Sequence, residues 1–211
     1  GYNMHAIITD GSISKIINHP KPLVIGDVQY PAKIFSVWTA SELAAIGIYE
    51  ITFDNSNKKD EKYYINTNQA YTYDADAGTV TAAYGNATAK AHADTLFTAQ
   101  DETEGKGTEG EVATRGLKYN FIKTIKAQAA GILQDTDWYI LRKADADTDV
   151  PSAITTFRAA VRTKAAAMET LITNASNTAA IETLYTYVNT ADEGDPVVMA
   201  RPLGEFPELG S

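Results

Sequence analysis

The stretch DETEGKGTEGE, residues 101–111, decides how this 211-residue sequence is organised. It contains five carboxylates and three glycines but no apolar side chain, so its burial in a core would be unfavourable. We therefore predict an acidic, glycine-rich linker or mobile loop here. It is expected to separate a β-rich N-terminal domain (residues 4–100) from a helical module (residues 112–190), which an extended, proline-punctuated tail (residues 191–209) follows.

Strand patterns fill the half that precedes this stretch. Two isoleucine-containing runs, residues 6–9 and 12–17, flank Asp10-Gly11, a dipeptide typical of tight hairpin turns. Residues 48–53 alternate their side chains as a half-buried strand does. Further strands are expected at residues 24–30, 63–65, 69–73 and 79–84. The pattern predicts a small antiparallel β domain.

One short helix is expected between these strands. Thr39 can cap its N-terminus, Glu42 stands three residues later as in a capping box, and Gly47 can end it. The β domain should therefore carry at least one helix.

Helical periodicity replaces the strand patterns after residue 111. Apolar residues recur at spacings of three and four from Leu117 to Ile132, which predicts an amphipathic helix. A second helix is expected to begin near Pro151, and a third to extend from Thr178 to Val188. The apolar stripe of the second helix comprises Ile154, Phe157, Val161, Ala165, Met168 and Leu171. The predicted fold class is α+β: an N-terminal small antiparallel β domain followed by a C-terminal three-helix module.

Charge and composition argue against several classes of function. The net charge of −9 disfavours binding to a nucleic-acid backbone or to an anionic membrane surface, because both attract clustered lysine and arginine. Cysteine is absent, so the chain offers no disulfide, thiolate metal site or thiol nucleophile. No apolar run reaches the roughly 20 residues of a membrane-spanning helix. We predict neither a nucleic-acid nor a membrane partner.

No group of residues indicates catalysis or a metal site. The histidines His5, His19 and His92 lie far apart in the sequence and lack zinc-site spacing. Residues 145–149 alternate aspartates as a calcium loop does, but the required glycine and glutamate are missing. A solvated loop is therefore favoured over weak calcium binding. Carboxylates gather in turns and in the acidic stretch instead of apolar strands. No catalytic residue, metal site or cofactor is predicted.

Aromatic and cationic side chains are most concentrated between residues 136 and 162. Two interpretations are open. The rings can be core residues, with arginine stems covering the core and pairing with acids. Alternatively, the group borders a partner-binding face, where tryptophan, tyrosine and arginine are common. The candidate partner-binding residues are Trp138, Tyr139, Arg142, Phe157, Arg158 and Arg162.

Tyrosine is frequent, with 12 copies, and many lie between residues 63 and 84. These rings can form an exposed face on the sheet that binds a glycan or another protein. They can equally be ordinary cross-strand pairs. The residues concerned are Tyr64, Tyr71, Tyr73 and Tyr84.

The C-terminal third resembles a module of tailed-phage proteins encoded near tail fibres. Residues 133–139, LQDTDWY, and residues 157–162, FRAAVR, are similar to the Asp-Trp, variable loop and aromatic-Arg-x-x-x-Arg helix of tail fibre assembly chaperones. Residues 30–38 and 42–48 are similar to the opening domain of many small phage tail-region proteins. Together these matches cover about half of the chain.

This resemblance implies a non-enzymatic protein that binds a tail fibre or another tail protein, as an assembly chaperone or accessory protein. Its expected location is the host cytoplasm during phage assembly, or the virion tail. The alternative is a virion structural component of the tail or fibre that stays on the particle and contacts host glycan through the tyrosines. A stable homo-oligomer would favour that alternative. An enzyme acting on a small polar substrate has the least support.

Overall fold

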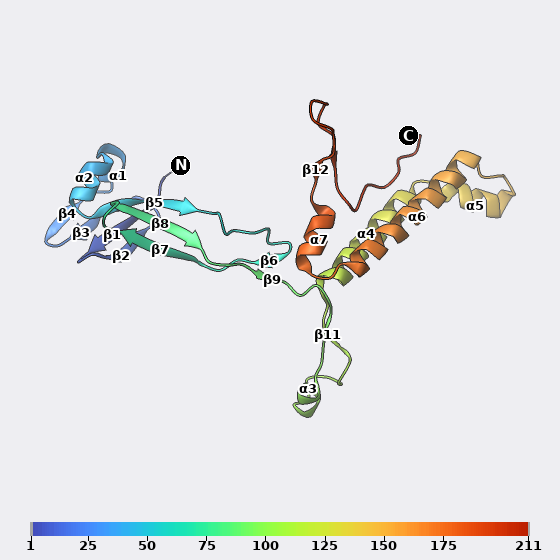
Figure 1. Cartoon of the computed structure of the whole chain (residues 1–211), viewed down its shortest axis with the longest axis horizontal. Helices are drawn as coiled ribbons and strands as arrows, with labels where there is room; N and C mark the ends of the chain where they lie inside the picture. The colour runs from blue at the N-terminus through green and yellow to red at the C-terminus, as the bar shows by residue number, and fades with distance from the viewer. Residues whose placement is uncertain (1, 211) are drawn as a thin grey trace. The chain divides into compact units, whose positions relative to one another are not determined.

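Strands fill the first half of the chain and helices most of the second, so the fold is α+β (Figure 1). The computed structural model describes residues 2–210. The chain forms two compact units, and the division falls between Thr88 and Ala89. We call them the β unit and the helical unit. Residues 101–111 lie inside the helical unit and do not separate the two.

A five-stranded sheet with the order β2-β1-β5-β8-β7 forms the β unit. Its neighbouring strands are antiparallel except for β5 and β8, which run parallel, so the sheet is mixed and not antiparallel as expected. The physical reason is the long connection between β5 and β8. Strand β7 lies within it and occupies the sheet edge, and β8 turns back from β7 to pair with β5 in the same direction. The strands β3 and β4 form a separate two-stranded sheet, and β6 and β9 form another. The elements are β1 (His5–Thr9), β2 (Ser12–Ile17), β3 (Leu23–Ile25), β4 (Val28–Tyr30), α1 (Ile34–Val37), α2 (Ala40–Ala45), β5 (Ile48–Asp54), β6 (Tyr64–Ile65), β7 (Gln69–Asp74), β8 (Thr79–Tyr84) and β9 (Thr88–Ala89).

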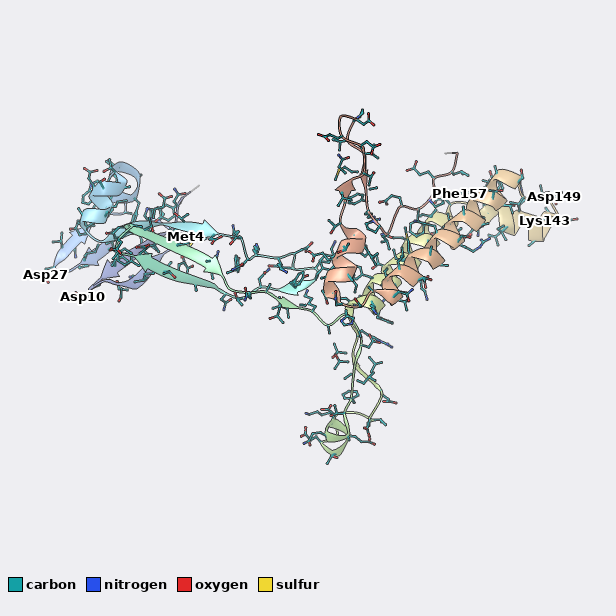
Figure 2. All side chains as sticks on the ribbon, viewed as in Figure 1. Met4, Asp10, Asp27, Lys143, Asp149 and Phe157 are labelled. Atoms are coloured by element: carbon teal, nitrogen blue, oxygen red, sulfur yellow. The ribbon has the colours of Figure 1, made fainter. Side chains whose placement is uncertain are left out.

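Local turn chemistry forms the first hairpin, as predicted. Asp10 and Gly11 have φ angles of 51° and 75°, the left-handed values of a type I′ turn. The pairing of β1 with β2 shifts register around Ser14, whose Oγ donates a hydrogen bond to the Ile7 carbonyl oxygen at 3.1 Å. Figure 2 places Asp10 and Asp27 at the tips of two neighbouring hairpins.

One apolar cluster of the β unit lies beneath α1, α2 and the β3-β4 hairpin. It consists of Ile7, Ile17, Leu23, Ile34, Leu43 and Ile48. The capping box of α2 is confirmed, because the Thr39 amide donates to the Glu42 carboxylate (2.7 Å) and the Glu42 amide to Thr39 Oγ1 (3.3 Å). Gly47 follows with φ of 79°, and a Cβ there would lie 2.7 Å from the Ile8 carbonyl oxygen. Only glycine fits this position.

A second apolar cluster is built on Ala6, Ile51, Val80 and Ala82. The edge strands β2 and β7 approach each other, so the sheet curls around this cluster. Isoleucines of β1 and β2 and tyrosines of β5 and β7 partly cover it.

An ordered arm replaces the predicted linker. The elements of the helical unit are β10 (Thr95–Leu96), α3 (Ala99–Thr103), β11 (Val112–Thr114), α4 (Leu117–Gln134), α5 (Asp137–Ala146), α6 (Ser152–Asn174), α7 (Thr178–Tyr185), β12 (Val188–Asn189) and β13 (Met199–Ala200). Strands β10 and β11 pair, and α3 lies between them at the far end of the arm (Figure 1). A capping box between Thr98 and Asp101 begins α3, and the Gly110 amide donates to the Phe97 carbonyl oxygen at 3.0 Å. Backbone and capping hydrogen bonds therefore order a segment that has no apolar side chains of its own.

Helices α4 and α6 lie side by side and run in opposite directions (Figure 1). Their core comprises Ile125, Ala129, Val161, Ala165, Met168, Ile172 and Leu203. Both predicted stripes are confirmed except at the C-terminal end of α6. There Ile172 is fully buried, and the expected Leu171 is 40% exposed.

Between residues 112 and 210 the structure has four helices instead of the predicted three. Helix α5 was not among the predicted helices, and its end reaches into the solvated loop expected at residues 145–149. Its apolar side chains face solvent, so it shows no buried apolar stripe that the sequence could reveal. From Arg201 to Gly210 the C-terminal tail forms no helix or strand, and it is anchored by Leu203. That side chain is fully buried, and its amide donates to the Leu184 carbonyl oxygen at 3.0 Å.

Candidate partner-binding surface of the helical unit

Arg158 holds the corner between α4 and α5. Its Nη1 donates to the Leu133 carbonyl oxygen (2.8 Å) and to Thr136 Oγ1 (2.7 Å), while Nη2 lies 2.9 Å from Oδ1 of Asp137. The Arg158 side chain is 13% exposed. A cation at the last carbonyls of α4 is also stabilised by the dipole of that helix. Arg158 therefore fixes the direction in which α5 leaves α4.

Three predicted residues come together on α5, and we call them the α5 stack: Trp138, Tyr139 and Arg142. The two ring centroids are 3.7 Å apart with 30° between the ring planes. The guanidinium carbon of Arg142 lies 4.9 Å from the Trp138 centroid and 5.4 Å from that of Tyr139. Trp138 is 50% exposed, so it is not a core residue. Its exposed ring and the neighbouring cation are the composition of a binding hot spot.

The surface around the α5 stack adds exposed apolar area. Ile140 and Leu141 are 44% and 69% exposed, and Leu141 lies on the same face of α5 as Trp138, three residues earlier. Within residues 2–210, the buried Nε of Arg142 has no hydrogen-bond partner. Leaving such a donor unsatisfied costs roughly 1–3 kcal/mol.

The aspartates of the predicted loop after α5 pair with a lysine. Nζ of Lys143 lies 2.7 Å from Oδ1 of Asp147 and 2.8 Å from Oδ1 of Asp149, and these hydrogen bonds raise the pKa of Lys143. Figure 2 shows Lys143 and Asp149 at the end of the helical hairpin. Two of the aspartates that weak calcium binding would have used, Asp147 and Asp149, therefore bind the ammonium group of Lys143. Over residues 2–210, no group of three or more histidines and carboxylates is arranged to hold a metal ion.

Phe157 and Arg162 do not join the α5 stack. Phe157 is partly buried against the α4–α6 core. Arg162 is exposed one turn further along α6, and within the described residues it has no hydrogen bond or ion pair. The structure thus separates the six predicted residues. Three form the exposed α5 stack, Arg158 supports it from beneath, Phe157 packs against the core, and Arg162 stands alone on the surface.

The predicted tyrosine face is only partly assembled. Pairing of β7 with β8 brings Tyr71, Tyr73 and Tyr84 to the same face as Val80, where all three are partly buried. Tyr73 also packs against Tyr49, with ring centroids 5.3 Å apart and 50° between the ring planes. Tyr64 belongs to β6, outside this sheet, and is 6% exposed. The four tyrosines therefore do not form one open face.

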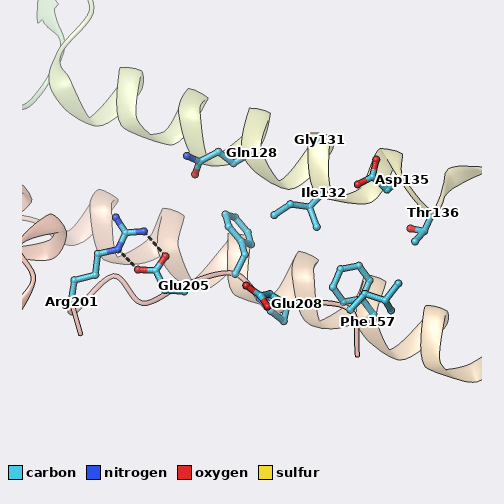
Figure 3. A pocket seen from close by; sticks show the side chains of 12 residues that line it. Gln128, Gly131, Ile132, Asp135, Thr136, Phe157, Arg201, Glu205 and Glu208 are labelled. Atoms are coloured by element: carbon cyan, nitrogen blue, oxygen red, sulfur yellow. Dashed lines mark hydrogen bonds and ion pairs between the residues drawn. The ribbon is translucent and has the colours of Figure 1, made fainter. Parts of the chain in front are cut away.

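A groove that we did not predict lies between α4 and the C-terminal tail (Figure 3). Its volume is about 760 Å³, within the range of roughly 300–1,000 Å³ common for ligand sites. The lining residues are Gln128, Gly131, Ile132, Asp135, Thr136, Phe157, Arg201, Glu205, Phe206, Pro207, Glu208 and Leu209. They come from three segments far apart in the sequence, so no local motif indicates the groove.

A second hollow, of about 350 Å³, surrounds His5 in the β unit. The His5 ring is 5% exposed, lies 5.1 Å from that of Phe35, and its Nδ1 is 3.0 Å from the Tyr2 hydroxyl. Burial lowers the pKa of His5, although a hydrogen bond to the Asn3 backbone and the charge of Glu50 oppose the shift. The sequence spacing of histidines gave no indication of this site.

Comparisons do not assign the chain to a family. No helix within residues 2–210 is long and apolar enough to cross a membrane. No protein-family model, curated protein or solved structure matches the chain.

Proposed function

We propose that this chain is a non-enzymatic tail-fibre assembly or accessory protein of a tailed phage, and that it binds its fibre or tail partner through the α5 stack. The observation that carries this proposal is the display of Trp138. A half-exposed tryptophan with a guanidinium against its ring stands on a helix whose direction Arg158 fixes. Tryptophan, tyrosine and arginine dominate the energetics of protein interfaces.

The two halves of the phage-like motif have complementary roles in this geometry. The Asp-Trp pair supplies Asp137, which binds Arg158, and Trp138, which faces solvent. The later helix supplies Arg158, which joins the end of α4 to the start of α5. A rigid support beneath an exposed ring lowers the entropy lost on binding. This division of roles supports a docking element.

Co-expression with the tail-fibre protein encoded next to this chain tests the proposal. The tagged chain should capture the fibre protein, and Trp138→Ala should weaken capture by about 2 kcal/mol, or roughly thirtyfold, as at other aromatic hot spots. Its melting temperature should change little, because half of the ring is already exposed.

Tyr119→Ala is the matched control. Tyr119 is 42% exposed and also lies beside an arginine, with the guanidinium carbon of Arg115 4.3 Å from its centroid, but it belongs to α4. Capture should survive this change. Equal losses from both substitutions, or no capture by the wild-type chain, would reject the α5 stack as the binding surface.

Immunoblots of purified virions separate the two roles within this proposal. A chaperone should capture the fibre and be absent from virions. A structural component should be present in them, which is the outcome expected for the alternative function.

A further inference from the structure

The groove between α4 and the C-terminal tail has an apolar floor. Ile132, Phe157 and Phe206 are partly buried there, with one side against the core and the other toward the groove. The tail wall is held from below by the fully buried Leu203. Leu209, further along, remains 53% exposed. This surface can accept a bulky apolar side chain.

Gly131 keeps the α4 wall of the groove open. It lies within an 18-residue helix, where glycine is less favourable than alanine by roughly 0.5–1 kcal/mol. A Cβ at this position would meet no atom within 4 Å, so packing does not require glycine here. The lack of a side chain instead leaves free space in the groove beside Ile132.

Carboxylates surround this apolar floor. Asp135 extends from the end of α4, and Glu205 and Glu208 come from the tail wall (Figure 3). Arg201 also lines the groove and pairs with Glu205 at 2.9 Å, so it neutralises one of these three carboxylates. Arg158 is not among the lining residues and binds Asp137. Within residues 2–210, Asp135 has no ion pair. The groove is therefore apolar at its floor and negative at its rim.

We propose that this groove binds a short extended segment of a partner protein that carries a bulky apolar side chain next to lysine or arginine. The apolar side chain packs between Ile132 and Phe157 in the space above Gly131. The neighbouring cation pairs with Asp135. This inference rests on the proposed function only in that the chain binds a partner protein, and it adds a second contact, distinct from the α5 stack.

Titration of the isotope-labelled full chain with three synthetic peptides tests the chemistry of the occupant. The first has a phenylalanine flanked by lysines, the second has glutamates in place of the lysines, and the third has serine in place of the phenylalanine. The first should shift the amide resonances of Gly131, Ile132 and Phe157, and it should bind about tenfold more tightly than either of the others. Equal binding of the three, shifts outside the groove or no binding overturns the proposal.

Substitutions at the groove provide a matched set. Gly131→Leu should abolish binding of the lysine peptide by filling the free space, whereas Ala130→Leu, on the exposed neighbouring position, should leave it unchanged. Asp135→Asn should weaken binding about two- to fivefold, as expected for an exposed ion pair. If Gly131→Leu is unfolded by circular dichroism, Gly131→Ala and Asp135→Asn carry the test. Retained full affinity in both variants rejects the site.

Two outcomes distinguish the groove from the proposed function. Peptide binding together with failure to capture a fibre protein would leave the groove standing and reject the phage partner. Light scattering measures the mass of the chain in solution and so tests whether a second copy fills the groove. A dimer that the Gly131→Leu substitution dissociates would mean that it does, and the basic-peptide proposal would be rejected.

Discussion

At the residue scale, Arg158 shows how one side chain can position a surface without belonging to it. Its guanidinium bonds to the carbonyl oxygen of Leu133, the hydroxyl of Thr136 and the carboxylate of Asp137. Arg158→Ala should lower the free energy of unfolding by about 2–3 kcal/mol, because partly buried polar groups lose a charged partner. Chemical denaturation measures this loss.

Arg162→Ala is the control, because Arg162 lies one turn away on the same helix and is exposed. Its stability should stay within about 0.5 kcal/mol of the wild type. Equal stability of the two variants would show that the Arg158 bonds contribute nothing to the corner.

His5 makes the stability of the β unit depend on pH. Burial lowers its pKa in the folded state below the ordinary value of 6.5, so below that pH the unfolded chain binds more protons than the folded one. The stabilisation is complete above about pH 6.5 and is lost as the pH falls through the folded-state pKa. Urea denaturation at pH 7 and pH 5 should show this decline. His5→Gln should reduce it, and substitution of the exposed His19 with Gln should not; an unchanged slope in His5→Gln would contradict the assignment.

At the element scale, helix α4 carries a glycine that its own stability does not require. Gly131→Ala should raise the free energy of unfolding by about 0.5–1 kcal/mol, since the helix gains a better former and the new Cβ meets open space. Thermal denaturation measures the gain, and Ala130→Gly should produce a loss of similar size. A destabilised Gly131→Ala variant would mean that the groove wall is more closely packed than this geometry indicates.

At the scale of the whole molecule, separate apolar clusters divide the chain into two units. The β unit has two clusters of its own, and the helical unit has the α4–α6 core with Leu203. Residues 2–88 and 89–210 expressed apart should therefore each fold cooperatively. Calorimetry should show transitions at the temperatures seen in the full chain, and an unfolded fragment would show that one unit depends on the other.

Local chemistry made much of the fold predictable from the sequence alone. The Asp10-Gly11 turn, the Thr39–Glu42 capping box and the apolar stripes of α4 and α6 depend on residues within a few positions of one another. The α+β class and the concentration of Trp138, Tyr139 and Arg142 in one segment follow from the same short-range patterns. Such features survive in a single sequence because their physical causes are themselves local.

Only the tertiary structure decided the features that join distant residues. The parallel pairing of β5 with β8, the ordered arm at residues 101–111 and the groove between α4 and the tail all depend on such contacts. Contacts between distant residues also separate Arg158 from Trp138, which the sequence placed together as candidate partner-binding residues. The arginine is held by groups 21 to 25 residues earlier, such as the Leu133 carbonyl oxygen, and the tryptophan faces solvent. The sequence pattern can indicate the secondary structure of a segment, but the burial of each side chain depends on which other segment packs against it.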